Sequence, residues 1–323
     1  MQTSLTHEIY ANLAFTPTEK QADLIRLLVE FSLSESDSRS CLLLKGYAGT
    51  GKTSVIGAYV KALKSIEKTT VLLAPTGRAV KVLSLNSNAR AYTIHKFIYR
   101  KKTLSGGGIT LALAPNLRKN TVFLVDEASM IGDYSVLNDG TVSSRNLLDD
   151  LLEYVYQHTS NKLIFIGDEG QLPPVGSDFS PALNLDYMQN NFFGISFLEF
   201  TLTEVLRQAE KSLILSNATK FRKAFDETHF PKLKVDNQKD VQRIDGMELQ
   251  EELEKAYNNV GLEETIFITK SNKKAMYYNA QIRNRILWYE DDLCKNDSLM
   301  VVKTIIFGLT SNLKWDLLPM AKF

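Results

Sequence analysis

The sequence of 323 residues has few cysteines, little net charge and no long hydrophobic run. Its two cysteines, Cys41 and Cys294, are too few for a disulfide framework or a zinc site. No apolar stretch is long enough to span a bilayer, and the N-terminus lacks the basic and apolar regions of a signal peptide. The sequence therefore predicts a cytoplasmic protein without zinc and without a membrane segment.

The net charge of +1 excludes a protein whose overall field attracts nucleic acid. Any nucleic-acid binding must use local basic patches, and each such patch alone is more typical of a solvated face. The patches are Arg100–Lys102, Arg118–Lys119, Lys270, Lys273–Lys274, Arg283 and Arg285. A hydrophobic content of 44% suffices for a sizeable core, and the length suggests about two domains.

What the sequence does contain is a complete phosphate-binding loop. Residues 46–53 read Gly-Tyr-Ala-Gly-Thr-Gly-Lys-Thr and directly follow the apolar run 41–44. Glycines let backbone N–H groups turn around a phosphate, and the helix N-terminus that follows attracts its charge. Lys52 is then placed to reach the β and γ phosphate oxygens of ATP, and the Thr53 hydroxyl to bind Mg²⁺. The predicted nucleotide-binding residues of the loop are Gly46, Ala48, Gly49, Thr50, Gly51, Lys52, Thr53 and Ser54.

Helix and strand patterns alternate along the first two-thirds of the chain. Helices are predicted after the N-cap Thr18 and over residues 53–68 and 146–158, and strands over 70–74, 122–125 and 162–166. Each strand is almost continuously apolar, which predicts an α/β fold with a parallel sheet covered by helices on both faces. Ligands of such sheets bind beyond the carboxyl ends of the strands.

Chemically active residue types stand at those ends. Asp126 and Glu127 follow a buried strand, where Asp126 is suited to hold Mg²⁺ and Glu127 to polarise the attacking water. Gln171 follows the next strand, where it is suited to contact the γ-phosphate. Arg207 ends a later apolar run and is a further candidate for reaching the nucleotide.

Together these motifs resemble the superfamily 1 DNA helicases of the RecD, Dda and Pif branch. The resemblance rests on Gln21, the phosphate loop, Ala74–Ala79, Thr93–Lys96, Asp126–Glu127, Gly167–Gln171 and Leu206–Gln208. It implies a RecA-like motor domain that hydrolyses ATP with Mg²⁺ and moves along single-stranded DNA, in this branch usually 5′ to 3′. It also implies a monomer as the default.

The resemblance assigns roles to further residues. Gln21 would read the adenine edge, and Arg207 would meet the γ-phosphate. Four residues fall on segments that face the DNA strand in similar helicases: Thr76, Arg78, Thr93 and His95. For His95 the alternative is packing inside its own helix.

Residues 98–120 are predicted to form a hairpin insertion with a glycine turn at Ser105–Gly108. In similar helicases an insertion here forms the pin that meets the duplex fork. A solvent-exposed loop without function is the alternative.

The resemblance divides the chain into a first RecA-like domain over residues 1–205, a helical connection over 206–262 and the beginning of a second RecA-like domain over 263–303. The sequence after Arg207 contains neither the Gln-Gly-Thr or Gln-Gly-Ser motif nor the terminal Thr-Arg motif of similar helicases. The chain alone is therefore expected to be a weak ATPase and no helicase.

Residues 304–323 are predicted to be an out-of-frame tail. One permitted set of codons for Lys314–Phe323, read one frame away, encodes Phe-Ile-Ala-Asn-Gly-Glu, which similar helicases carry at this point. A frameshift near Lys303 is the hypothesis that follows, and the gene sequence decides it.

The sequence is also compatible with two other functions. One is a P-loop ATPase related to the PhoH-like proteins, which share the Gly-Asp-x-x-Gln segment. The other is a nucleotide-dependent module that binds DNA or a partner without turnover.

Overall fold

The computed structural model describes residues 2–34, 38–103, 109–133, 135–136, 142–143, 146–204, 212–224, 231–236, 240–291, 293–295, 297, 299–300 and 318–319. The chain divides into two compact units, Met1–Gln208 and Ala209–Phe323. Each unit is described by itself.

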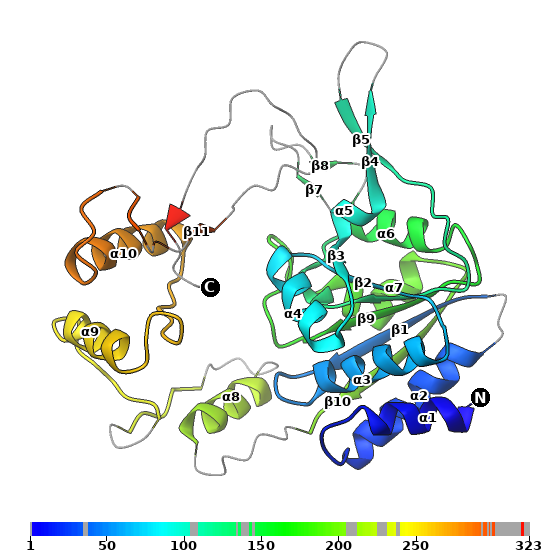
Figure 1. Ribbon diagram of the computed structural model, residues 1–323, viewed down its shortest axis with the longest axis horizontal. Helices are drawn as coiled ribbons and strands as arrows, with labels where there is room; N and C mark the ends of the chain where they lie inside the picture. The colour runs from blue at the N-terminus through cyan, green and yellow to red at the C-terminus, as the bar shows by residue number, and fades with distance from the viewer. Residues whose placement is uncertain are drawn as a thin grey trace. The chain divides into compact units, whose positions relative to one another are not determined.

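A six-stranded parallel sheet forms the centre of the first unit (Figure 1). Its strands follow the order β10-β1-β9-β6-β2-β3, and every neighbouring pair is parallel. Their bounds are β1 (Arg39–Gly46), β2 (Thr70–Ala74), β3 (Ala91–Thr93), β6 (Val122–Val125), β9 (Lys162–Gly167) and β10 (Ile195–Leu202). This confirms the predicted α/β, RecA-like fold.

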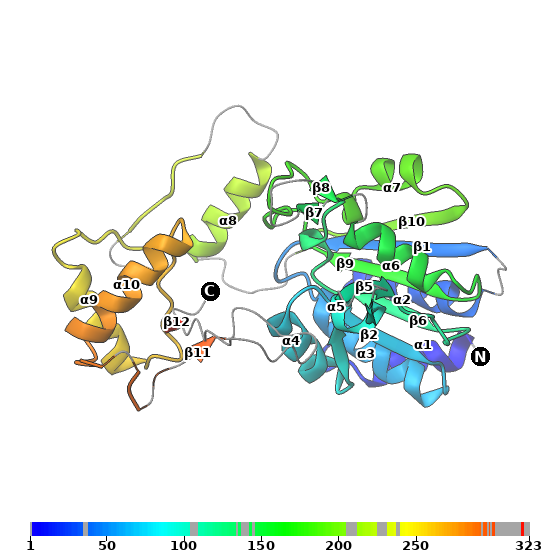
Figure 2. The same ribbon diagram turned by 90° about the horizontal axis from the view of Figure 1, so that it is seen from above.

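Helices cover both faces of the sheet (Figure 2). One face carries α1 (Gln2–Ala11), α2 (Glu19–Leu33), α3 (Lys52–Ser65) and α4 (Gly77–Ser87). The other carries α5 (Ile94–Ile98), α6 (Leu147–Val155) and α7 (Leu185–Asn191). Successive side chains of a strand point to opposite faces, so the apolar strands supply both cores. In β1, Leu42 and Leu44 enter one core, while Cys41 and Leu43 enter the other.

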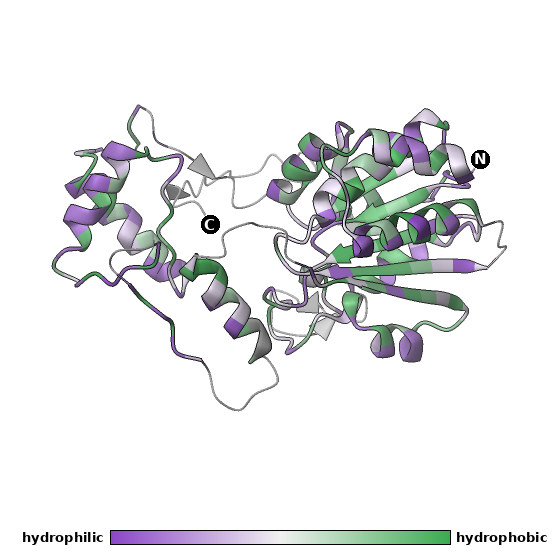
Figure 3. Ribbon diagram, turned by 90° about the horizontal axis from the view of Figure 1, so that it is seen from below, coloured by the Kyte–Doolittle hydropathy of each residue, from purple (hydrophilic) through white to green (hydrophobic). Residues whose placement is uncertain are grey.

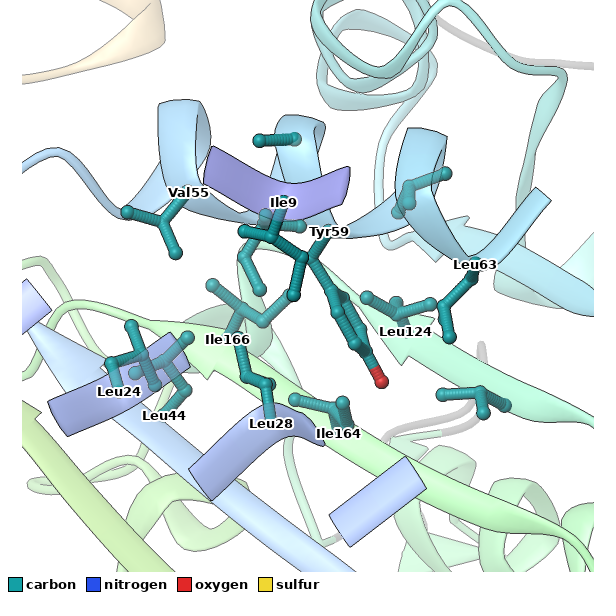
Figure 4. Packing of buried hydrophobic residues seen from close by; sticks show 14 of the residues in the cluster. Ile9, Leu24, Leu28, Leu44, Val55, Tyr59, Leu63, Leu124, Ile164 and Ile166 are labelled. Atoms are coloured by element: carbon teal, nitrogen blue, oxygen red, sulfur yellow. The ribbon is translucent and has the colours of Figure 1, made fainter. Parts of the chain in front are cut away.

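The core beneath α3 is densely packed around Tyr59. Figure 4 shows Tyr59 reaching from α3 toward Ile164 and Leu124 of the sheet, with Leu28 of α2 and Ile9 of α1 nearby. The Tyr59 hydroxyl lies 2.6 Å from Oγ of Ser32, which gives its one polar atom a partner. Burial raises the pKa of Tyr59, so the phenol stays neutral.

The hairpin predicted over residues 98–120 is present as an antiparallel pair, β4 (Tyr99–Thr103) and β5 (Ile109–Leu113). Its glycine turn at Ser105–Gly108 lies outside the described residues. A second small pair, β7 (Ser135–Val136) and β8 (Val142–Ser143), precedes α6. Two 3₁₀ turns, η1 (Ala128–Met130) and η2 (Pro181–Leu183), follow β6 and β9.

The second unit contains α8 (Leu213–Lys223), α9 (Leu249–Asn259), α10 (Asn272–Arg285) and the antiparallel pair β11 (Leu299–Met300) and β12 (Leu318–Pro319). In Figure 3 the strands of the first unit are mostly green, whereas α9 and α10 are largely purple. Apart from Leu318–Pro319, the predicted out-of-frame tail lies outside the described residues. The frameshift and the division after residue 205 stay predictions. No helix in the described ranges is long and apolar enough to cross a bilayer.

Candidate functional site

The phosphate loop lies between β1 and α3, where the strand-loop-helix motif requires it. Gly49 and Gly51 have φ values of 82° and 84°, in the left-handed region that side chains with a Cβ rarely adopt. Gly51 is also the N-cap of α3, so the unpaired N–H groups of the first helical turn face the loop. A helix start of this kind attracts anions.

Lys52 closes the loop on itself. Its Nζ donates to the backbone oxygen of Gly46 and, at 2.9 Å, to that of Tyr47. Thr50 braces the same turn, because its Oγ1 donates to the Tyr47 oxygen at 2.8 Å. The ammonium group of Lys52 therefore lies inside the loop, where backbone oxygens bind it.

Most of the predicted nucleotide-site residues line one pocket of about 410 Å³. Those present are Ala48, Gly49, Gly51, Lys52, Thr53, Ser54, Asp126, Glu127 and Gln171. Gln21, Gly46 and Thr50 do not line it, and Arg207 lies outside the described residues. Four lining residues that the sequence reasoning missed are Tyr47, Val82, Gly167 and Asp168. Tyr47, Gly167 and Asp168 stand inside the recognised motifs, but no sequence signal distinguished Val82.

The acidic pair Asp126 and Glu127 follows β6 and faces the lysine. Burial raises the pKa of Asp126, although the Glu127 N–H, which donates to its Oδ1 at 2.9 Å, and the charge of Lys52 oppose the rise. Burial and the charge of Asp126 raise the pKa of Glu127. Two carboxylates held this way attract a cation, and Asp126 with the Thr53 hydroxyl offers the oxygen ligands that Mg²⁺ prefers.

Glu127 has a backbone conformation that favours glycine, with φ at 54°. Such conformations cost free energy and cluster at functional sites, where the surroundings hold them. Here the Gln171 amide donates to the Glu127 carboxylate, and Ser129 Oγ lies 3.5 Å from Oε1 of Gln171. The carboxylate of Glu127 is thus oriented by neighbouring side chains.

The Gln21 side chain is buried, and both ends of its amide are already hydrogen-bonded within the protein. Its side chain is 1% exposed and completes a capping box with Thr18 at the start of α2. Its Oε1 accepts from the Thr18 N–H at 3.1 Å, and its Nε2 donates to the backbone oxygen of Thr50 at 2.9 Å. Gln21 therefore connects α2 to the phosphate loop.

The residues predicted to face DNA gather at the carboxyl ends of β2 and β3. Thr93 ends β3 in register with Ala74, the last residue of β2, and Thr76 caps α4 by accepting from the Ala79 N–H at 3.2 Å. Arg78 is exposed on the first turn of α4. The His95 ring lies 5.8 Å from that of Tyr99, and burial lowers the pKa of His95. His95 thus lies near Tyr99, the residue directly after its own helix, and is two residues from Thr93 in the chain, so both roles stay predictions.

The sequence match to known families agrees with this geometry. A family described as an AAA domain matches residues 18–245, well over half of the chain. The chain belongs to this AAA domain family. The matched range covers the whole nucleotide pocket of the AAA domain, from the capping box at Thr18 through Gln171.

Curated relatives of this AAA domain include DNA helicases. The ATP-dependent DNA helicase dda of Enterobacteria phage T4 is 29% identical over 193 residues, which cover 59% of this chain and 39% of the phage protein. The ATP-dependent RecD2 DNA helicase of Deinococcus radiodurans is 28% identical over 183 residues, 55% of this chain and 21% of that protein. The uncharacterized protein MJ1519 of Methanocaldococcus jannaschii is 32% identical over 146 residues, 42% of this chain and 11% of that protein.

These matches confirm the resemblance to RecD/Dda-like superfamily 1 helicases. They support a helicase-like P-loop module that uses ATP. The chain spans less than two fifths of the length of each of these relatives.

Proposed function

We propose that this chain is the ATP-binding part of a DNA helicase motor, in which Mg²⁺-dependent ATP hydrolysis drives movement along single-stranded DNA. The observation that carries the proposal is the single pocket in which Lys52, the Asp126–Glu127 pair and Gln171 converge. Phosphoryl transfer depends mainly on positioning and on charge stabilisation, and these residues supply both.

Each residue has a defined part. Lys52 exchanges its backbone partners for the β and γ phosphate oxygens, while Thr53 and Asp126 hold Mg²⁺. Glu127 orients the attacking water, and its hydrogen bond from Gln171 links that carboxylate to the residue beside the γ-phosphate. Arg207 is proposed to approach the γ-phosphate on the strength of the resemblance alone.

A second pocket, of about 380 Å³, is proposed to hold the base. It shares Thr53 and Ser54 with the phosphate pocket and extends past them to the segment Asn12–Phe15 and to Asn86. The Phe15 ring offers a face for stacking, and the two asparagine amides offer donors and acceptors. Gln21 would contact the base only after leaving Thr18 or Thr50.

Single-stranded DNA is proposed to run along the ends of β2 and β3, past Thr76, Arg78, Thr93 and His95. Hydroxyl and arginine contacts to phosphates position a strand without reading its sequence. The β4–β5 hairpin, with Arg100, Lys101 and Lys102 on β4, is proposed as the pin at the fork. Binding should then weaken steeply with salt and show little sequence preference.

The test is nucleotide binding and hydrolysis by the full chain, with and without single-stranded DNA, for the parent, Lys52→Ala and Lys64→Ala. Lys64 is the matched control, because it is an exposed lysine on the same helix. Lys52→Ala should abolish nucleotide-dependent signals, and Lys64→Ala should leave them unchanged. Equal behaviour of both variants would contradict the proposal.

The same measurements separate the alternatives. A rate that DNA stimulates supports the motor. A steady rate that DNA does not change supports a PhoH-like ATPase, and ATP-dependent DNA binding without turnover supports a binding module. The helicase relatives favour the motor over both.

A further inference from the structure

One charged side chain lies inside the sheet directly beside the phosphate loop. Lys45 is the penultimate residue of β1, next to Gly46, and is only 8% exposed. By strand alternation it shares a face with Cys41 and Leu43, which belong to the core. Nothing in the phosphate-loop motif requires a lysine at this position.

Two carboxylates hold the Lys45 ammonium group. Its Nζ lies 2.6 Å from Oε1 of Glu169 and 2.5 Å from Oε1 of Glu199. Burial lowers the pKa of a lysine, but these two partners outweigh burial and leave the pKa of Lys45 raised. The ammonium group is therefore a permanent positive charge that joins β1 to Glu199 on β10 and to Glu169 in the turn after β9.

Glu169 belongs to the turn that carries Gln171 into the nucleotide pocket. Within the turn, Asp168 Oδ1 accepts from the Gly170 N–H at 2.8 Å, and the Asp168 backbone oxygen accepts from the Gln171 N–H at 3.1 Å. A Cβ added at Gly170 would lie 3.5 Å from the Tyr47 ring. The strand and loop proposed to hold the phosphates are thus joined to this turn by Lys45, and the Tyr47 ring leaves little more than the space of a methyl group beside Gly170.

An ion pair of a buried lysine can also be purely structural, with no effect on a neighbouring site. The position of the Lys45–Glu169 pair indicates that it also affects the nucleotide pocket. Glu169 is separated from Gln171 by one residue, and both Asp168 and Gln171 line the pocket. A displacement of Glu169 would therefore move the residue beside the γ-phosphate.

We propose that Lys45 is a positioning residue, which fixes the Asp168–Gln171 turn against the phosphate loop and so places the Gln171 amide where the γ-phosphate binds. This inference rests on the proposed ATP site. Lys45 also ties the turn to β10, the strand from which the chain leaves the first unit.

The experiment compares the affinities of the full chain for Mg²⁺ with a nonhydrolysable ATP analogue and for Mg²⁺ with ADP. Lys45→Met should weaken binding of the triphosphate about tenfold more than binding of ADP, because only the triphosphate uses Gln171. Gln171→Ala should give the same selective loss, and the double variant should lose no more than either single variant. Lys45→Arg should restore the ratio.

Glu169→Gln and Glu199→Gln form the matched pair. Each removes one carboxylate from Lys45, but only Glu169 belongs to the turn. Glu169→Gln should reproduce the selective loss, and Glu199→Gln should cause much less of it. Because the Glu169 side chain is half exposed, its variant should fold even if Lys45→Met does not.

Two outcomes would overturn the inference while leaving the ATP site intact. In the first, the Lys45 and Glu169 variants lose equal affinity for the triphosphate and for ADP. In the second, neither variant loses affinity for either nucleotide. If the parent binds neither nucleotide, or binds both independently of Lys52, the proposed function fails together with the inference.

Discussion

The two units of the chain are stabilised by different means. In the first, large apolar side chains fill both faces of the sheet. Among the described residues of the second, the buried hydrophobic side chains are Ala224, Ala275 and Ile282, while Met247, Ile268 and Trp288 are at least 80% exposed. Apolar burial is the main favourable contribution to folding, so the first unit should be much more stable than the second.

The described part of the second unit contains well-formed polar contacts. Arg283 donates to both carboxylate oxygens of Asp297, at 3.0 and 2.7 Å, and the Asp240 carboxylate accepts from the Leu213 N–H at 2.8 Å at the start of α8. Such contacts fix local geometry but contribute less than a core. All the described residues of the nucleotide pocket lie in the unit with the core.

The largest expected effect is a loss of stability when a core isoleucine is truncated, and one isoleucine from each unit allows the comparison. Ile164→Ala, in the sheet core, should lower the free energy of unfolding of the first unit by about 4 kcal/mol, whereas Ile282→Ala should leave that unit unchanged. Hydrogen exchange measured by mass spectrometry at increasing urea follows the two units separately, because each peptide belongs to one unit.

The two units should unfold in separate transitions, and the second unit should lose protection from exchange at lower urea. Ile164→Ala should move only the transition of the first unit, at higher urea. A single transition, moved equally by both substitutions, would mean that the units unfold together and that the contrast is wrong.

Arg283→Met should have the next largest effect. Removing one member of a buried, doubly hydrogen-bonded pair leaves Asp297 uncompensated and should destabilise the second unit by about 3 kcal/mol. Arg285→Met is the control, because Arg285 is exposed on the same helix. The urea transition of the second unit, followed by hydrogen exchange, should shift for Arg283→Met alone, and an equal shift for Arg285→Met would refute a specific role of the pair.

Thr18→Ala should have a smaller effect, on the first unit. It removes the side-chain oxygen that accepts from the Gln21 N–H and should cost about 1 kcal/mol. Thr16→Ala, at an exposed position just before the helix, should cost little. The circular dichroism midpoint distinguishes the two, and no difference between them would show that the capping box adds nothing measurable.

The sequence predicted those parts of the first unit that local patterns determine. The apolar runs at 70–74, 122–125 and 162–166 became β2, β6 and β9, because a buried parallel strand is recognisable from its own residues. The motif residues Lys52, Asp126 and Gln171 met in one pocket, because carboxyl ends of parallel strands share an edge.

What the sequence did not predict depends on contacts between distant segments. The ion pairs of Lys45 follow from the register of β1 with β9 and β10, which no local pattern reveals. The engagement of Gln21 with Thr50 depends on how α2 packs beside the phosphate loop. In the second unit, residues 264–270 have a strand-like apolar pattern but form no strand, since a strand requires a pairing partner.

The smallest expected effect is the contribution of His95 to the pH dependence of stability. It tests whether burial in the first unit lowers the pKa of this side chain. Burial holds the pKa of His95 below its usual 6.5, so the folded state binds this proton less readily than the unfolded chain does. Stability should therefore fall as the pH drops below about 6.5, and His95→Gln should lose less stability than the parent over that range. Urea midpoints at neutral and mildly acidic pH measure the difference, with His7→Gln, at an exposed position on α1, as the control. A parent and a His95→Gln variant with identical pH profiles would show that His95 is solvated, and hence free to take up a proton beside a DNA phosphate.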